Sequence, residues 1–156
     1  VMGTGEPHIT VGDFTLGAGL YRQLCEYGAK RGVTPVREPN GDLSSSKAML
    51  AFLDRAGSDN CGVLWDVHHT VRFGSESPVE TFAALGTYVN HAHLKDSVMR
   101  GSRVEYRMMG YGDVPVADAV TLLDRAGFDG FFSLEGVKRG NPDLQEPGIV
   151  FAHYKN

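Results

Sequence analysis

Short apolar runs and longer amphipathic segments alternate along this sequence. Helical spacing of apolar residues predicts helices over four ranges: 15–30, 44–55, 78–85 and 113–126. Apolar or alternating runs predict strands over five ranges: 33–38, 61–66, 88–95, 105–109 and 131–135. Strands separated by helices imply right-handed βαβ crossovers and a parallel sheet. We therefore expect an α/β fold with about five parallel strands, and a single domain over residues 1–156.

The composition narrows the class of protein. The 156 residues are 42% hydrophobic and 22% charged, with a formal net charge of −4, as in ordinary globular domains. With no run of Lys or Arg, neither nucleic acid nor an anionic membrane surface is expected as the main partner. No apolar stretch approaches the ~20 residues of a membrane helix. Cys25 and Cys61 lie in apolar contexts, and we expect reduced, buried thiols in a cytoplasmic protein rather than a disulfide.

Four residues that could bind a metal stand at or near the ends of predicted strands: Glu38, Asp66, His93 and Glu135. In a parallel α/β fold the carboxyl ends of the strands converge on one edge, where function is located. A strand-terminal acid is more often a cap than a ligand, but four such residues on one edge favour a site. Three carboxylates and one imidazole suit Mn²⁺, Mg²⁺ or Co²⁺, and Zn²⁺ or Fe²⁺ as alternatives.

Two histidine motifs surround these candidates. In His91-Ala92-His93-Leu94-Lys95, strand alternation puts His91, His93 and Lys95 on one face. Two imidazoles and an ammonium inside a barrel are costly unless they serve a ligand or metal, although an edge strand facing water is the alternative.

In the second motif, Asp66-Val67-His68-His69, a turn after Asp66 would bring His69 over the site. The sequence does not decide which of the two histidines faces it. By local signals, Gly110-Tyr111-Gly112 indicates only a flexible turn.

Five segments, in this order and spacing, resemble the sugar phosphate isomerase/epimerase family, whose members are xylose isomerase-like TIM barrels related to endonuclease IV. They are Val36-Arg37-Glu38, Trp65 to His69, His91 to Asp96, Gly110 to Pro115, and Phe132 to Glu135. The resemblance covers residues 12–140 and implies a (β/α)8 barrel. A complete barrel needs ~250 residues. This chain would therefore be the C-terminal part, roughly strands 4–8, with Val1-Met2-Gly3 as the tail of strand 3.

The resemblance implies a divalent metal held by Glu38, Asp66, His93 and Glu135, the same four residues that their positions indicate. It also implies that Glu38 and Glu135 are the catalytic acid/base pair and that His69 binds substrate. The residues expected to bind substrate are therefore His69, Lys95 and His91.

The function expected from this site is a metal-dependent isomerase or epimerase acting on a small sugar, sugar phosphate or polyol. A proton next to a carbonyl would be moved through a metal-bound enediolate. One alternative is a metal-dependent dehydratase or lyase of a cyclic polyol or shikimate-like acid. Another is a barrel fragment without activity that only binds or packs against a partner. Phosphodiester cleavage, the reaction of endonuclease IV relatives, is disfavoured by the acidic net charge. A homo-oligomer is a further expectation.

Overall fold

The computed structural model describes residues 11–136, 138, 141–142 and 144–155, with side chains from residue 13 onward. The segment Val1-Met2-Gly3, expected to end a strand, lies outside the described residues. Within them, no helix is both long enough and apolar enough to span a membrane.

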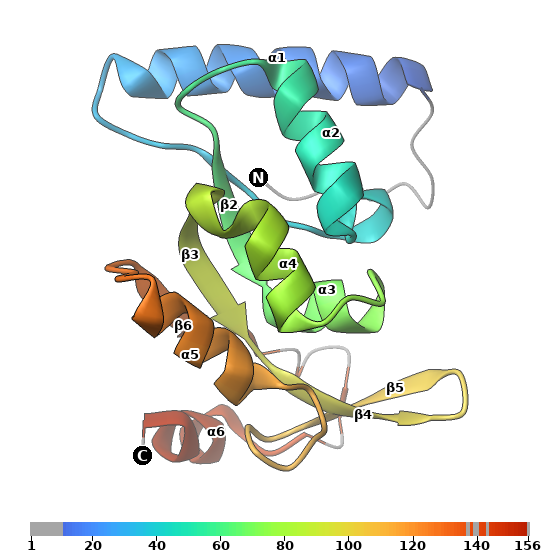
Figure 1. Cartoon of the computed structure of the whole chain (residues 1–156). Coiled ribbons are helices and arrows are strands. Elements are labelled where there is room, and N and C mark those ends of the chain that lie inside the picture. Colours follow the sequence, from blue (N-terminus) through green and yellow to red (C-terminus); the bar gives the residue numbers. More distant parts are fainter. Residues whose placement is uncertain (1–10, 137, 139–140, 143, 156) are drawn as a thin grey trace.

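Four parallel strands form the main sheet, in the order β1-β2-β3-β6 (Figure 1). They are β1 (Val36–Arg37), β2 (Gly62–Asp66), β3 (Val89–Leu94) and β6 (Phe131–Leu134). Four helices pack side by side on one face of this sheet. They are α1 (Val11–Ala29), α2 (Ser46–Ala56), α4 (Pro78–Leu85) and α5 (Val116–Arg125). This arrangement confirms the predicted α/β architecture.

The core lies between the sheet and this helical layer. Val63 and Trp65 of β2 and Ala92 of β3 are fully buried in it, together with Leu85 of α4 and Leu123 of α5. Alternation along β3 therefore turns His91 and His93 toward the other face of the sheet. Interior-facing and exterior-facing residues alternate in this way along the strands of a barrel.

The strand expected over 105–109 does not belong to the parallel sheet. Residues 96–107 form an antiparallel hairpin of β4 (Asp96–Arg100) and β5 (Arg103–Arg107), which projects from the body of the molecule (Figure 1). Because only a two-residue turn separates β4 from β5, the chain cannot make a parallel crossover, which needs a dozen or more residues. Within the described residues the parallel sheet therefore has four strands and not five.

Shorter elements connect these strands and helices. Helix α3 (Val67–Arg72) begins directly after β2. Pro115 is the N-cap of α5, and Asp113, two residues earlier, pairs with Arg72. The part of the chain that the structure describes also contains the 3-10 turns η1 (Gly41–Leu43) and η2 (Gly86–Tyr88), and helix α6 (Pro147–Lys155).

The predicted helix over 15–30 is confirmed as α1, but its leucine stripe faces outward. Leu16, Leu20 and Leu24 are 62%, 56% and 41% exposed, whereas Tyr21 and Cys25 are buried against the sheet and α2. Cys25 and Cys61 are both buried free thiols, with Sγ atoms 3.5 Å apart.

Candidate active site

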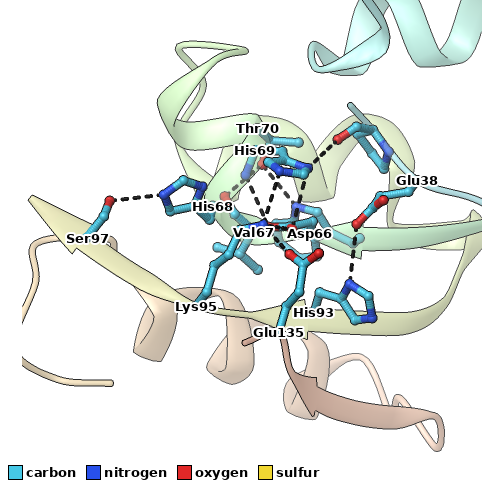
Figure 2. A network of polar contacts seen from close by, with 12 residues as sticks. Glu38, Asp66, Val67, His68, His69, Thr70, His93, Lys95, Ser97 and Glu135 are labelled. Atoms are coloured by element: carbon cyan, nitrogen blue, oxygen red, sulfur yellow. Dashed lines mark hydrogen bonds and ion pairs between the residues drawn. The ribbon is translucent and has the colours of Figure 1, made fainter. Parts of the chain in front are cut away.

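The four predicted metal-binding residues meet at the carboxyl ends of the four parallel strands. Glu38, Asp66, His93 and Glu135 each place one donor atom within 4.8 Å of the donor atoms of the others. Glu38 follows β1, Asp66 ends β2, His93 lies on β3 and Glu135 follows β6. Figure 2 shows these side chains converging from the separate strands.

Each of these side chains is anchored by its element. Asp66 is fully buried, and its Oδ1 accepts a hydrogen bond from the His69 backbone N–H at 3.1 Å, which caps α3. The Glu135 N–H donates to the Leu94 carbonyl at 3.1 Å, which extends the β3–β6 pairing past the end of β6. His93 Nδ1 lies 3.3 Å from Glu38 Oε1. The donor positions are therefore set by backbone pairing and capping.

Lys95 lies at the centre of this group and is 4% exposed. Its Nζ is 2.7 Å from Asp66 Oδ2, contacts Glu135 Oε2, and is 3.1 Å from His69 Nε2. Burial alone would lower the pKa of Lys95, but the carboxylates of Asp66 and Glu135 raise it above its ordinary value. At neutral pH Lys95 is therefore a positive charge inside the site.

The two acids beside Lys95 respond to it differently. Burial, opposed by Lys95 and reinforced by the nearby Glu135, raises the pKa of Asp66 to about 6. Burial acts in the same direction on Glu135, but hydrogen bonds with Lys95 and Asp66 and the charge of Lys95 outweigh it and lower the pKa of Glu135. Glu135 is therefore ionised at neutral pH and can accept a proton.

The donor set fits a divalent cation. With Glu38, Asp66 and Glu135 ionised, the single positive charge of Lys95 leaves two negative charges uncompensated in a largely buried cluster. Carboxylates that share a buried site need a cation or a proton. Carboxylate oxygens with one imidazole are typical ligands of Mg²⁺ or Mn²⁺, and also of Zn²⁺ or Fe²⁺.

The two histidines after Asp66 have different surroundings. His69 Nδ1 donates to the Pro39 carbonyl at 3.1 Å, so its Nε2 is free to accept from Lys95. Burial lowers the pKa of His69, and it lowers that of His68 to about 3, so both rings are neutral. His68 turns away, bonding Ser97 Oγ at 3.0 Å and stacking on Tyr106. The turn after β2 thus places His69 at the site.

His91 lies outside the four-residue cluster. Its Nε2 is 2.7 Å from Ser133 Oγ, and its ring meets that of His93 edge to face at 5.6 Å. Its register partners, Leu64 and Phe131, are two residues before those of His93 along the strands. His91 therefore lies one layer below the strand ends, where it supports His93. Its role as a substrate ligand stays a prediction.

Sequence reasoning missed the contacts of Asp96. This buried carboxylate accepts hydrogen bonds from four backbone N–H groups, including those of Gly110 and Gly112. The predicted flexible turn is therefore tied to the end of the histidine motif. In the sequence, the only sign of this contact was that His91 to Asp96 and Gly110 to Pro115 both belong to the family pattern.

Comparisons with known proteins agree with this fold. The family model described as Xylose isomerase-like TIM barrel matches residues 18–151. A curated protein from Streptomyces coelicolor, "Putative hydroxypyruvate isomerase", is 29% identical over 111 residues, which are 69% of this chain and 37% of that protein.

Solved structures show the same fold. The probable 3-DHS dehydratase involved in petrobactin synthesis from Bacillus anthracis is 20% identical, with a TM-score of 0.74 over 94% of this chain and 57% of that one. An L-ribulose 3-epimerase is 17% identical, with a TM-score of 0.70 over 99% of this chain and 50% of that one. The chain thus spans little more than a third of the curated relative and about half of the solved ones.

Proposed function

Because the chain belongs to the xylose isomerase-like TIM barrel family, we propose that it is the metal-binding half of a sugar isomerase or epimerase. The substrate is a small hydroxy ketone, and the reaction moves a proton on a carbon next to the carbonyl. The observation that carries this proposal is the convergence of three carboxylates and one imidazole around Lys95 at a single rim.

The two glutamates are placed to work from different sides. Glu38 follows β1 and Glu135 follows β6, the two outer strands of the sheet, while Asp66 and His93 lie between them. A substrate carbon held over the inner pair is therefore within reach of one carboxylate on each side. Such a pair can remove a proton from one face and return one to the other, which inverts the carbon.

The proton transfer involves these two carboxylates, the substrate and solvent. Glu135, whose pKa is lowered chiefly by Lys95 against the effect of burial, takes the proton from the carbon. The electron pair of the broken C–H bond moves toward the carbonyl oxygen. When that pair returns to the carbon, Glu38 in its protonated form supplies a proton to the opposite face. Exchange with solvent then removes the proton from Glu135 and returns one to Glu38. A divalent metal at this site, when bound, polarises the carbonyl and stabilises the negative charge that develops.

Lys95 and His69 are the proposed substrate-binding residues beside this pair. The Lys95 ammonium is 3.1 Å from His69 Nε2, so both can meet a substrate oxygen at the same place. The Pro39 carbonyl holds the ring of His69 in one tautomer, with the proton on Nδ1. Such preorganised groups stabilise developing charge without reorganisation.

The experiment that tests the proposal is solvent deuterium exchange. The protein is incubated in D₂O with Mn²⁺ and, separately, with hydroxypyruvate, D-fructose, D-allulose or L-ribulose, and label on the carbon next to the carbonyl is followed by NMR. Glu135→Gln, measured at saturating Mn²⁺, should lower the exchange rate by roughly a hundredfold or more. Glu26→Gln, an exposed change on α1, is the matched control.

Two outcomes would contradict the proposal. Exchange that is unchanged in Glu135→Gln would remove this residue from the reaction. A product lighter than its substrate by one water would favour the dehydratase alternative, which uses the same proton abstraction followed by loss of a hydroxyl group.

A further inference from the structure

The two cysteines of the chain meet inside the molecule, away from the cluster at the strand ends. Cys25 lies on α1 and Cys61 immediately precedes β2, and their Sγ atoms are 3.5 Å apart. Asp66, which belongs to the cluster, is at the other end of β2. In a barrel the carboxyl ends of the strands carry the chemistry, and the amino ends contribute to stability. The thiol pair is therefore a separate feature that the proposed function does not use.

Hydrogen bonds hold the backbones on both sides of this pair. The side-chain amide of Asn60, next to Cys61, donates to the Cys25 carbonyl at 3.0 Å. The Tyr21 hydroxyl, one helical turn before Cys25, lies 2.8 Å from the carbonyl oxygen of Gly62. Both residues adjacent to Cys61 are thus bonded to the part of α1 that carries Cys25. The two sulfur atoms are held facing each other before any bond joins them.

The two thiols differ in what can reach them. Cys25 is fully buried, whereas Cys61 is 9% exposed. Burial, and then the adjacent Cys61, raise the pKa of the Cys25 thiol to about 12, so it keeps its proton at neutral pH. The thiolate is the form of cysteine that attacks an oxidant. The first attack therefore belongs to Cys61, and the oxidant must be small enough to reach a nearly buried sulfur.

The spacing of the pair suits a disulfide. From 3.5 Å, the sulfur atoms must approach by about 1.5 Å to reach the ~2.05 Å of an S–S bond. Rotation of two short side chains can supply this movement while the backbones stay in place. The two residues are 36 positions apart in the sequence, so a bond between them would close a long loop in the unfolded chain and stabilise the folded one.

We propose that hydrogen peroxide converts Cys25 and Cys61 into a reversible disulfide that fastens α1 to the start of β2. The Cys61 thiolate attacks one peroxide oxygen, the O–O bond breaks, and the other oxygen leaves as water with the proton that the thiol released. The Cys25 sulfur then attacks the sulfenic acid formed at Cys61. The S–O bond breaks, and the hydroxyl group leaves as a second water with the Cys25 proton. Two thiols are oxidised to one disulfide, and one peroxide is reduced to two waters.

Mass spectrometry and thermal melts test this site. The protein is reduced, freed of reductant, and treated with a few equivalents of hydrogen peroxide. Its intact mass should fall by two hydrogens, and a digest should contain one peptide pair joined through Cys25 and Cys61. The melting temperature should rise by about 10 °C, because the new bond closes a long loop. Dithiothreitol should reverse both changes.

Single variants separate the roles of the two thiols. Alanine is the replacement, because a buried cysteine packs as a small apolar side chain. In Cys25→Ala the second step is missing, so Cys61 should stay as a sulfenic acid that dimedone traps. In Cys61→Ala only the buried Cys25 remains, and its oxidation should be at least roughly tenfold slower. The double variant, treated alike, controls for oxidation of methionine, and its melting temperature should not rise.

Several results would overturn the proposal. One is a treated protein whose thiols are unchanged, or whose Cys61 carries a sulfinic acid with no bond to Cys25. Another is a disulfide that joins two chains, and a third is oxidation in Cys61→Ala as fast as in Cys25→Ala. These measurements use neither substrate nor metal, so their outcome is independent of the proposed function.

Discussion

At the scale of single residues, the site depends on one buried ammonium among carboxylates. Lys95 is placed where it neutralises part of the charge of Asp66 and Glu135, and a divalent cation would share the same oxygens. The free energy of unfolding should therefore depend both on the presence of Lys95 and on the binding of a metal.

Replacing Lys95 with Met should destabilise the metal-free protein by about 3 kcal/mol, because removing one partner of a buried pair leaves an uncompensated charge. A divalent cation supplies the missing charge, so saturating Mn²⁺ should recover much of this loss. Urea denaturation in EDTA and in Mn²⁺ measures both values. Lys47→Met, an exposed change on α2, is the control, and an equal loss with and without metal would contradict this role of Lys95.

The pKa of Asp66 makes metal binding depend on pH. Burial raises this pKa to about 6 in the metal-free folded protein, against about 4 in an unfolded chain. The folded state therefore holds this proton more tightly, and the stability that Asp66 contributes is present below about pH 4 and lost as the pH rises through 6. A metal needs the ionised carboxylate, so protons compete with it below pH 6.

We therefore expect Mn²⁺ to raise the melting temperature, relative to EDTA, by more at pH 7 than at pH 5. Thermal melts at both pH values measure this gain. Asp66→Asn should abolish most of the gain at pH 7, whereas Asp113→Asn should retain it. A gain that is equal or larger at pH 5 would show that Asp66 does not bind the metal.

At the scale of elements, the loop between β5 and α5 requires a residue without a side chain at Gly112. A Cβ at Gly112 would lie against the Asp96 carboxylate and the Ser97 carbonyl. At Gly101, in the β4–β5 turn with a φ of +60°, a Cβ would meet nothing within 4 Å. Alanine at Gly112 would therefore measure the cost of a steric clash. Alanine at Gly101 would measure the cost of a left-handed backbone conformation.

Gly112→Ala should destabilise the protein by about 3 kcal/mol, through overpacking and weakened hydrogen bonds to Asp96. Gly101→Ala should cost about 1 kcal/mol, because it only places alanine in a left-handed conformation. Urea denaturation of the two variants gives the comparison. A Gly112→Ala protein as stable as Gly101→Ala would mean that the loop does not need its close approach to Asp96.

At the scale of the whole molecule, the four-stranded sheet and the outer face of α1 are only partly covered. Among the residues that the structure describes, the outer strands β1 and β6 each pair with one neighbour, and Phe131 on β6 is 75% exposed. Leu16, Leu20, Leu24 and Tyr27 form an exposed apolar stripe on α1. Open strand edges and apolar patches favour association.

We predict that the 156-residue chain, studied alone, self-associates through this stripe. Leu20→Glu should shift light-scattering mass toward the monomer with little change in stability, since Leu20 is 56% exposed. Gln23→Glu adds the same charge at another exposed position of α1 and should have no such effect. The prediction would be contradicted if the unmodified chain were monomeric at a protein concentration of tens of micromolar.

Local signals were sufficient for the elements and for the identities of the candidate ligands. Apolar periodicity reports which segments bury a face, so the four parallel strands and the main helices could be predicted. A polar residue at the end of a buried strand is visible in the sequence, so Glu38, Asp66, His93 and Glu135 could be named. That these four converge follows from the rule that parallel strands end at one edge.

Tertiary contacts decided the rest, because they depend on pairing between segments and on charge balance in three dimensions. Periodicity could not distinguish the buried face of α1 from its exposed leucine stripe. Strand propensity over 105–109 could not show that β5 pairs back onto β4. The position of Lys95 between Asp66 and Glu135, and the wrapping of a glycine loop around Asp96, arise only when several strand ends meet in a buried space where each charge requires a partner.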